Sequence, residues 1–600
     1  MAERVLAQPR SGWRWFASYL LPISITLLAM ALYLYGLESK SLWFDELGTL
    51  TGAGWGGSWE DAIRNPLTIP TTPKPPLSYL TTRLFMLLGD SVFLLRLPAA
   101  LFATLTIPLV FVLGRSFFDG QTGLLGAFLL AIAPLHLRYA QEARMYAMLT
   151  FLSILSLYLF WRAIRSRRAR WWVWFAVVAV LALYTHLFAA LILGVMALFA
   201  LCLLVRPRGR PRFPFHGGHF VLATAVILLA YAPMAPFVVR GLVSVEGFGG
   251  EAKPGWGMAE LLATLRLFSG GNDVGLVVYA CLFGLAVVTL VAKDRQVLTL
   301  TAMWIALPVI FVLVLPFGHA VRVRYFLSAL PVYLLLVAYG LRVATRWLAA
   351  WAGRRPRSAN LPAAAGVLTA VLLLGLLAGI AVPSMAAYYA ETKQDWRQAT
   401  RLVHSLAVTG EPIFVRHPYH QVGVLYYAHQ LAGDTQGWTE ANVQILPRDL
   451  EVAFPPDRKR RSWLVVPLMG TFLTDGDFEV RIRPHYRLLS PILLPPSRLP
   501  KESWIISPPT FRTLAVIPVV PYEPPSIRFW ADDYTLNPGE CTWLRWEVDR
   551  VREVYLDGEG VVGHDQRQVC PRTKSRYELQ FVEMDGSVQA ETVEIEVSAP

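Results

Sequence analysis

The segment FLLRLPAALFATLTIPLVFVL, residues 93–113, carries one charged side chain among its 21 positions. As an α-helix it would be about 32 Å long, enough to cross the roughly 30 Å hydrocarbon core of a bilayer. The whole chain has the same bias, because 55% of its 600 residues are hydrophobic and only 16% are charged. The sequence therefore predicts a polytopic α-helical membrane protein.

Ten further apolar segments are predicted to span the membrane, which makes eleven in all. Basic runs between them, such as RAIRSRRAR at 162–170, mark cytoplasmic loops by the positive-inside rule. The net charge of +13 is thus explained by topology and not by nucleic acid. An odd number of spans puts everything after residue 384 outside the cytoplasm. The predicted spans are 16–36, 93–113, 122–138, 145–162, 171–185, 187–205, 219–239, 272–291, 297–316, 323–341 and 362–383.

Residues 38–92 are predicted to form one long external segment. The apolar stretch at 75–89 would reach only about 22 Å as a helix, so we expect it to lie at the membrane interface. Other polar clusters fall on the same face, and their arginines run against the positive-inside bias. So many external arginines indicate an anionic ligand, for which phosphate is the natural candidate. These clusters are at 136–146, 184–186, 245–257 and 317–325.

The external stretch SLWFDELGTL, residues 41–50, contains adjacent acids at Asp45 and Glu46. Asp45 could cap a short helix, with Glu46 in its first turn, or either acid could serve catalysis. Lys74 also allows two interpretations: its side chain could extend toward the lipid headgroups, or its ammonium could be a point charge that binds a lipid phosphate. His186 could simply end a helix, and no spacing of ligands supports a metal site.

The C-terminal third has a different composition and is predicted to fold outside the membrane. Residues 385–507 alternate helix and strand patterns, as in a small α/β domain, and 508–525 form a proline-punctuated linker. Short alternating strands in 526–600 are typical of a β-sandwich. Cys541 and Cys570 would join two of its strands in an oxidising compartment, with independent thiols as the alternative.

Seven short motifs in this order resemble glycosyltransferase family 39, the protein O-mannosyltransferase-like membrane enzymes, which are related to the aminoarabinose lipid A transferase. The resemblance implies a C-type glycosyltransferase fold and a polyprenyl-phosphate sugar donor, with a lipid, glycan or protein as acceptor. The final domain resembles immunoglobulin-like modules. The motifs are DE, KPPL, RLPAALF, QEARMY, YTH, RVRYFLSALP and DWR.

The resemblance also implies roles for individual residues. Asp45 matches the family's general base and Glu46 its neighbour, while Lys74 is similar to a lysine aimed at the lipid phosphate. Sugar transfer needs one carboxylate to deprotonate the acceptor and cations to stabilise the departing phosphate, which predicts inversion and requires no metal, although a divalent metal is compatible. The expected donor-phosphate set is Lys74, Arg96, Arg324 and Tyr325, and the expected substrate-binding set is Arg138, Arg144, Tyr146, His186 and Arg322.

Two other classes of function remain open at this point. A lipid-linked sugar flippase would need polar groups near the membrane midplane, whereas here they gather at the outer face. A cell-surface binding protein would use the β domain and would need far fewer spans. Both are weaker than the glycosyltransferase hypothesis.

Overall fold

In the computed structural model, the chain forms two compact units. The first comprises Met1–Arg401, Pro418–Thr435 and Leu494–Leu514, and the second comprises the remaining residues. The structure describes residues 19–68, 74–205, 217–243, 257–314, 322–353, 361–432, 438–447, 450–455, 460–467, 486–494, 514–522, 524–584 and 586–598. Most of the predicted external cluster at 245–257 and the first part of the cluster at 317–325 lie outside these ranges.

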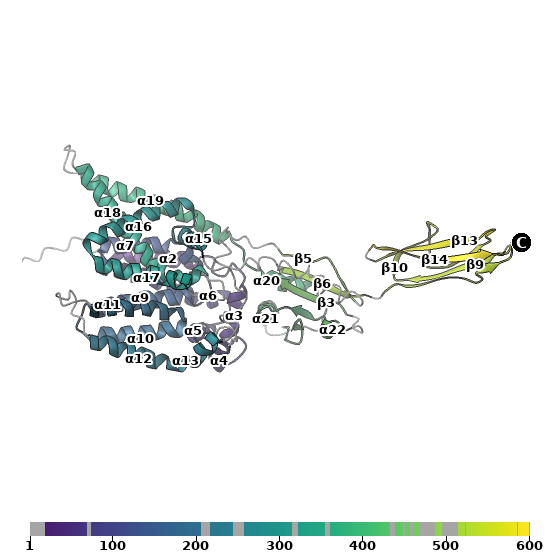
Figure 1. Cartoon of the computed structure of the whole chain (residues 1–600), viewed down its shortest axis with the longest axis horizontal. Helices are drawn as coiled ribbons and strands as arrows, with labels where there is room; N and C mark the ends of the chain where they lie inside the picture. Colours follow the sequence, from purple (N-terminus) through teal and green to yellow (C-terminus); the bar gives the residue numbers. More distant parts are fainter. Residues whose placement is uncertain are drawn as a thin grey trace, which may run out of the picture. The chain divides into compact units, whose positions relative to one another are not determined.

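The first unit is a bundle of apolar helices (Figure 1). Among the described residues, seven helical segments are long and apolar enough to cross a membrane, or eight if the bent pair α7–α8 is one span. Three further apolar helices, α2, α10 and α11, are shorter. The prediction of a polytopic helical membrane protein is confirmed, and each of the eleven predicted spans coincides with one of these helices or pairs. The helices are α2 (Leu21–Leu34), α6 (Val92–Phe117), α7 (Gly120–Ala131), α8 (Pro134–Ala140), α9 (Tyr146–Ile164), α10 (Arg170–Thr185), α11 (Phe188–Val205), α12 (Gly217–Tyr231), α13 (Ala235–Val243), α15 (Met258–Phe268), α16 (Asp273–Lys293), α17 (Arg295–Val314), η3 (Val323–Ala329), α18 (Leu330–Gly353) and α19 (Leu361–Ala390).

Small residues bring the central helices close together. A Cβ on Gly114 of α6 would lie 2.6 Å from the Cα of Gly123 in α7, and a Cβ on Gly340 of α18 would lie 1.9 Å from a backbone oxygen of α16. Glycine is therefore required at these crossings, as at many membrane helix interfaces. The span containing α18 is 94% buried in the bundle, so it forms the centre.

Three short helices follow the first span: α3 (Phe44–Gly52), α4 (Trp59–Leu67) and α5 (Leu77–Met86). α3 begins at Phe44, with Trp43 at the N-cap position, and Asp45 and Glu46 lie in its first turn. The interpretation of Asp45 as the cap is therefore wrong. Acidic side chains in a first turn still favour the helix, because they face the positive end of its dipole.

Two helices that follow the membrane spans also pack in this unit. They are α20 (Trp396–Leu406), whose last turn belongs to the second unit, and α21 (Pro418–Ala432). α21 packs on α3: a Cβ on Gly423 would lie 2.9 Å from the side chain of Leu47, and Tyr427 Oη accepts a 2.7 Å hydrogen bond from the backbone N–H of Leu42. α21 therefore forms part of the surroundings of the two acids.

The described residues of the second unit form three β-sheets, and its strands are drawn as arrows in Figure 1. One has the order β2-β1-β3-β6-β4, with β5 also paired to β6, and its β1 is parallel to both β2 and β3. The strands are β1 (Ile413–Val415), β2 (Val443–Ile445), β3 (Ser462–Pro467), β4 (Tyr486–Leu488), β5 (Ile492–Leu493) and β6 (Leu514–Pro521), accompanied by α22 (Leu450–Ala453).

β6 corrects one expectation, because it lies inside the segment 508–525 predicted to be a linker. Residues 514–519 are buried, and the strand pairs with β4 and β5. Burying this apolar run contributes more free energy than the strand loses because its prolines lack backbone N–H donors. Proline is tolerated at such irregular positions of a sheet. The prolines were therefore a misleading signal for a linker.

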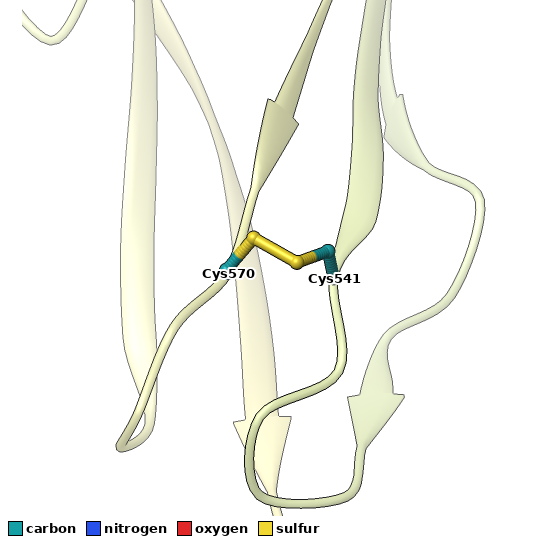
Figure 2. Close-up of a disulfide and its surroundings, with 2 residues drawn as sticks. All are labelled: Cys541 and Cys570. Carbon is teal, nitrogen blue, oxygen red and sulfur yellow. A yellow bond between two sulfur atoms is a disulfide. The ribbon is translucent and has the colours of Figure 1, made fainter.

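The last part of the chain forms two sheets, with the orders β11-β10-β13-β14-β8 and β12-β9-β7. A disulfide between Cys541 and Cys570 links the start of β9 to the end of β12 (Figure 2). The strands are β7 (Ser526–Ala531), β8 (Thr535–Leu536), β9 (Thr542–Asp549), β10 (Val551–Leu556), β11 (Glu559–Val561), β12 (His564–Val569), β13 (Ser575–Glu583) and β14 (Val588–Val597).

Candidate active site

Three cations surround the carboxylate of Asp45 in the first turn of α3. Arg324, at the start of the span containing α18, forms an ion pair with it. Arg144, from the loop before α9, donates a 2.9 Å hydrogen bond to the backbone carbonyl of Asp45 and a 3.0 Å hydrogen bond to Thr49 Oγ1. Lys74, before α5, interacts electrostatically with all three groups. The cluster thus carries more positive than negative charge.

Several donors of this cluster remain available to a ligand. The Nε atoms of Arg144 and Arg324 are buried and have no hydrogen-bond partner among the described residues. Among the described residues, the ammonium of Lys74 also has no hydrogen-bond or ion-pair partner. Buried donors normally find acceptors, so this arrangement favours an anion that brings its own oxygens.

The surroundings of the cluster lower the pKa values of both Asp45 and Lys74, for different reasons. Burial alone would raise the pKa of Asp45, but Arg324, Arg144 and Lys74 together lower it well below its usual range. Burial and the neighbouring Arg144 lower the pKa of Lys74 to about 7, against the opposing influence of Asp45. Asp45 is therefore ionised at neutral pH, while Lys74 is close to its own titration point.

Aromatic rings form one side of the cluster. Tyr146 lies beneath the guanidinium of Arg324, with its ring centroid 5.4 Å away. Tyr325 stacks on Phe188 with centroids 4.7 Å apart, and His186 contacts both tyrosines. Burial and the nearby Lys74 lower the pKa of His186 to about 3, so its ring is neutral at physiological pH.

Glu46 has very different surroundings, although it is adjacent to Asp45 in the sequence. Its two carboxylate oxygens each accept a 2.8 Å hydrogen bond from Arg96, and one also accepts a 2.8 Å bond from the N–H of Ala143. Burial would raise its pKa, but Arg96 and Lys393 lower the pKa to about 2. Both side chains are almost fully inaccessible.

Arg96 has no donor left for a ligand. A guanidinium has five N–H groups. Besides its two bonds to Glu46, Arg96 donates to the carbonyls of Leu37, Lys40 and Ser41 at 2.9 to 3.1 Å. It therefore ties the end of α2 to the start of α3, in contrast to the phosphate-binding position expected from the sequence.

A second buried ion network lies on the other side of Glu46. Arg138 forms a bidentate ion pair with Glu391, just after the last span. The ammonium of Lys393 lies 3.8 Å from the carboxylate of Glu46 and 3.1 Å from that of Glu142. Burial would raise the pKa of Glu391, whereas Arg138 lowers it. Neither Glu391 nor Lys393 was predicted to be a site residue. The pattern that could have indicated them is a pair of charged residues directly after a predicted span, next to the DWR motif.

Two tyrosines beside Asp45 were also missed. Tyr79 of α5 is 1% exposed and interacts electrostatically with both Arg144 and Asp45. Tyr419 of α21 does the same and packs against Phe44 with ring centroids 5.2 Å apart. Neither tyrosine stands in a motif, so only the packing of α5 and α21 on α3 brings them to the site.

The expected site residues therefore separate into two groups. Asp45 and Glu46 face opposite groups of partners, and Arg322 is half-buried close to Arg324. The residues that gather around Asp45 are Lys74, Arg144, Tyr146, His186, Arg324 and Tyr325. Those in the other group are Glu46, Arg96 and Arg138.

The surroundings of the two acids do not fit a metal centre. In the part of the chain that the structure describes, no three His, Cys, Asp or Glu side chains are grouped to hold an ion. Asp45 and Glu46 are each paired with arginine, and a cation would have to displace those partners.

Residues 73–237 match the family model described as dolichyl-phosphate-mannose-protein mannosyltransferase. That segment contains Lys74 and Arg144 but not Asp45 or Arg324. No curated protein matches the chain significantly.

Among solved structures, the chain is similar to ArnT from Cupriavidus metallidurans. With the apo form the TM-score is 0.51 at 15% identity, over 84% of this chain and 98% of that one. With the form bound to undecaprenyl phosphate it is 0.50 at 14% identity, over 85% and 98%. At this identity the likeness concerns the fold. The predicted family resemblance is thus confirmed for residues 73–237, within a polytopic membrane fold similar to that of ArnT.

Proposed function

We propose that this chain transfers a sugar from a polyprenyl-phosphate carrier to an acceptor hydroxyl on the extracytoplasmic side of the membrane. The observation that carries the proposal is the group of three cations around the single carboxylate of Asp45. One anionic leaving group and one proton acceptor are what this reaction requires. The family match of residues 73–237 and the undecaprenyl phosphate bound by ArnT agree with such a donor.

The proposed reaction is a single displacement. Asp45 takes the proton of the acceptor hydroxyl as its oxygen attacks the anomeric carbon. The bond between that carbon and the phosphate oxygen breaks, and its electron pair leaves with the polyprenyl phosphate. Because one carboxylate acts as base and none as nucleophile, the configuration at the anomeric carbon inverts.

Binding of the donor would itself activate the base. Arg324 pairs with Asp45 in the structure and lowers the pKa of that carboxyl, which makes Asp45 a weak base. A phosphate that takes over donors from Arg324 and Arg144 adds a negative charge beside Asp45. Both changes raise the pKa of Asp45. The carboxylate would therefore become a better proton acceptor only once the sugar donor is in place.

Glu46, Arg96 and Arg138 receive a different role in this proposal. Their hydrogen bonds are already made within the protein, so we assign them to holding α3 and the loop before α9. Arg144 in that loop then reaches Asp45. The phosphate-binding set is accordingly Lys74, Arg144 and Arg324, with Tyr146 and Tyr325 as its aromatic side.

The remaining predictions complete the proposal. We infer eleven spans in a C-type glycosyltransferase fold, with residues after 384 outside the cytoplasm and an immunoglobulin-like domain at the end. The disulfide between Cys541 and Cys570 is consistent with that side, because such bonds persist in oxidising compartments.

The test uses purified full-length protein in lipid nanodiscs, a polyprenyl-phosphate sugar labelled on the sugar, and a cell-envelope extract as acceptor. The expected result is free polyprenyl phosphate together with an acceptor-bound label of inverted configuration. The flippase alternative predicts movement of intact donor across vesicles without cleavage. Intact donor after incubation with several sugars would contradict the proposal.

A further inference from the structure

A cavity lies beyond the C-terminal end of α3, the end that is far from Asp45. It has a volume of about 340 Å³ and is open to solvent. Its walls come from the turn after α3, the C-terminal part of α5 with the following turn, and α21. Its polar and aromatic lining side chains are Trp55, Arg83, Asp90 and His429. No motif in the sequence points to it.

Several hydrogen bonds fix the walls of this cavity. Trp55 donates from its indole N–H to Asp90 at 3.2 Å, and Gln430 of α21 donates to the other carboxylate oxygen at 2.8 Å. Arg83 donates to the carbonyls of Gly54 and Gly57 at 2.6 and 2.5 Å. The turn after α3 can adopt its shape because Gly54 has a φ of +69°. The cavity is therefore built from a braced turn and not from a mobile loop.

The cavity's chemistry favours an uncharged, polyhydroxylated ligand. Trp55 is half-buried: its ring makes T-shaped contacts with Tyr426 and His429, and its remaining exposed surface lines the cavity. Asp90 can accept hydrogen bonds and His429 can donate or accept them, with side chains 30% and 47% exposed. Arg83 keeps its positive charge while its terminal nitrogens bond to carbonyls, and the carboxylate of Asp90 in the same lining carries the opposite charge. The lining therefore lacks the excess of positive charge found around Asp45, which favours an uncharged ligand over an anion here.

α21 connects this cavity to the proposed reaction centre. Tyr419, in its first turn, lies beside Asp45 and Arg144, while His429, ten residues later, lines the cavity. Ten helical residues span about 15 Å. An acceptor that occupied both places would be extended along α21.

We propose that this cavity binds a neutral carbohydrate portion of the acceptor, with a sugar ring on Trp55 and its hydroxyls on Asp90 and His429. This inference rests on the glycosyltransferase proposal for its role, but the binding itself does not depend on catalysis. It assigns the acceptor a glycan segment about 15 Å away from the hydroxyl that is modified.

The test measures binding of the full-length protein in nanodiscs to an array of neutral and acidic oligosaccharides. Wild type should bind a subset of the neutral glycans. Trp55→Ala should weaken that binding about tenfold, because it removes the aromatic surface, and His429→Ala should weaken it by a smaller factor. The matched control is Leu88→Ala, which changes a 73% exposed neighbour outside the cavity lining and should bind like wild type.

Asp45→Asn separates this inference from the proposed function, because it should retain full glycan binding while losing transfer. Thermal unfolding of each variant identifies a loss of binding caused by misfolding. Because the side chain of His429 is 47% exposed, His429→Ala should fold normally. If Trp55→Ala does not fold, His429→Ala alone tests the inference. Absence of neutral glycan binding by wild type, preference for acidic glycans, or full binding by both cavity variants would overturn the inference.

Discussion

Asp45 and Glu46 are neighbours on one helical turn, yet they lie in two opposite kinds of charge cluster. The Glu46 cluster is closed: all five N–H groups of Arg96 are bonded within the protein, and both side chains are inaccessible. The Asp45 cluster is open: its cations exceed its acids, its side chains remain partly exposed, and buried Nε atoms lack partners among the described residues. The comparison teaches that a carboxylate in a pair of acids is a candidate for chemistry when its partners still have donors to offer.

The closed cluster supports the open one through the backbone. Glu46 holds the N–H of Ala143, and the next residue, Arg144, donates to the carbonyl of Asp45. A rigid scaffold around Glu46 therefore positions a cation beside Asp45. Substitutions in the Asp45 cluster should consequently lower the rate of sugar transfer, whereas substitutions in the Glu46 cluster should lower the stability of the protein.

The largest expected effect is on catalysis by the open cluster. Asp45→Asn removes the proton acceptor but keeps the shape of the side chain, so kcat for sugar transfer should fall about 10²- to 10⁴-fold. Binding of the donor should not weaken, because one competing negative charge is lost. Initial rates with labelled donor, together with the thermal midpoint, measure both. Near-normal kcat in a folded Asp45→Asn protein would show that Asp45 is not the base.

The reciprocal substitution, Glu46→Gln, should act on stability. It leaves the buried guanidinium of Arg96 without its counter-charge, a change that typically costs about 3 to 5 kcal/mol of unfolding free energy. Denaturant titration in mild detergent checks the loss. A second variant, Glu46→Gln with Arg96→Gln, should recover part of it, because the uncompensated charge is gone. A stable Glu46→Gln protein without transfer activity would instead place Glu46 in the chemistry.

The sequence predicted the positions of the membrane helices well, because hydrophobicity over some 20 residues decides them. It also predicted that Asp45, Lys74, Arg144 and Arg324 would share one face. The residue pattern by itself could not show which acid lies in the open cluster, because that depends on backbone carbonyls gathered around Arg96 by the turn between α2 and α3.

Long-range pairs were equally inaccessible to the sequence. Arg138 and Glu391 are separated by 253 residues, and each alone resembles an ordinary charge at the end of a helix. Tyr419 comes from a segment predicted to belong to a separate domain, and only the packing of α21 on α3 brings it to Asp45. Pairing of such groups is decided by tertiary structure, which leaves no local pattern in the chain.

A smaller effect concerns the pH dependence of the open cluster. Because burial and Arg144 lower the pKa of Lys74 to about 7, the free protein loses this charge as the pH rises above 7 and must regain a proton to bind phosphate. Affinity for polyprenyl phosphate should therefore fall about fiftyfold from pH 7 to pH 9, a range in which the phosphate stays mostly doubly ionised. Binding isotherms measure it. Lys74→Arg, which stays charged, should flatten the profile, and an identical fall in that variant would exclude Lys74 as its cause.

The smallest expected effect concerns the hydroxyl acceptor that orients Arg144. Thr49 Oγ1 accepts a 3.0 Å bond from Arg144, which is also held by the carbonyl of Asp45. Thr49→Val keeps the side-chain volume but removes this acceptor. Arg144 then keeps its hydrogen bond to the carbonyl of Asp45, and its side chain becomes more mobile. The net value of one such bond is about 1 kcal/mol, so KM for the donor should rise about fivefold while kcat stays unchanged. Thr51→Val is the control, because its hydroxyl bonds only within α3. A fall in kcat instead would mean that Arg144 acts on the transition state and must be held rigidly.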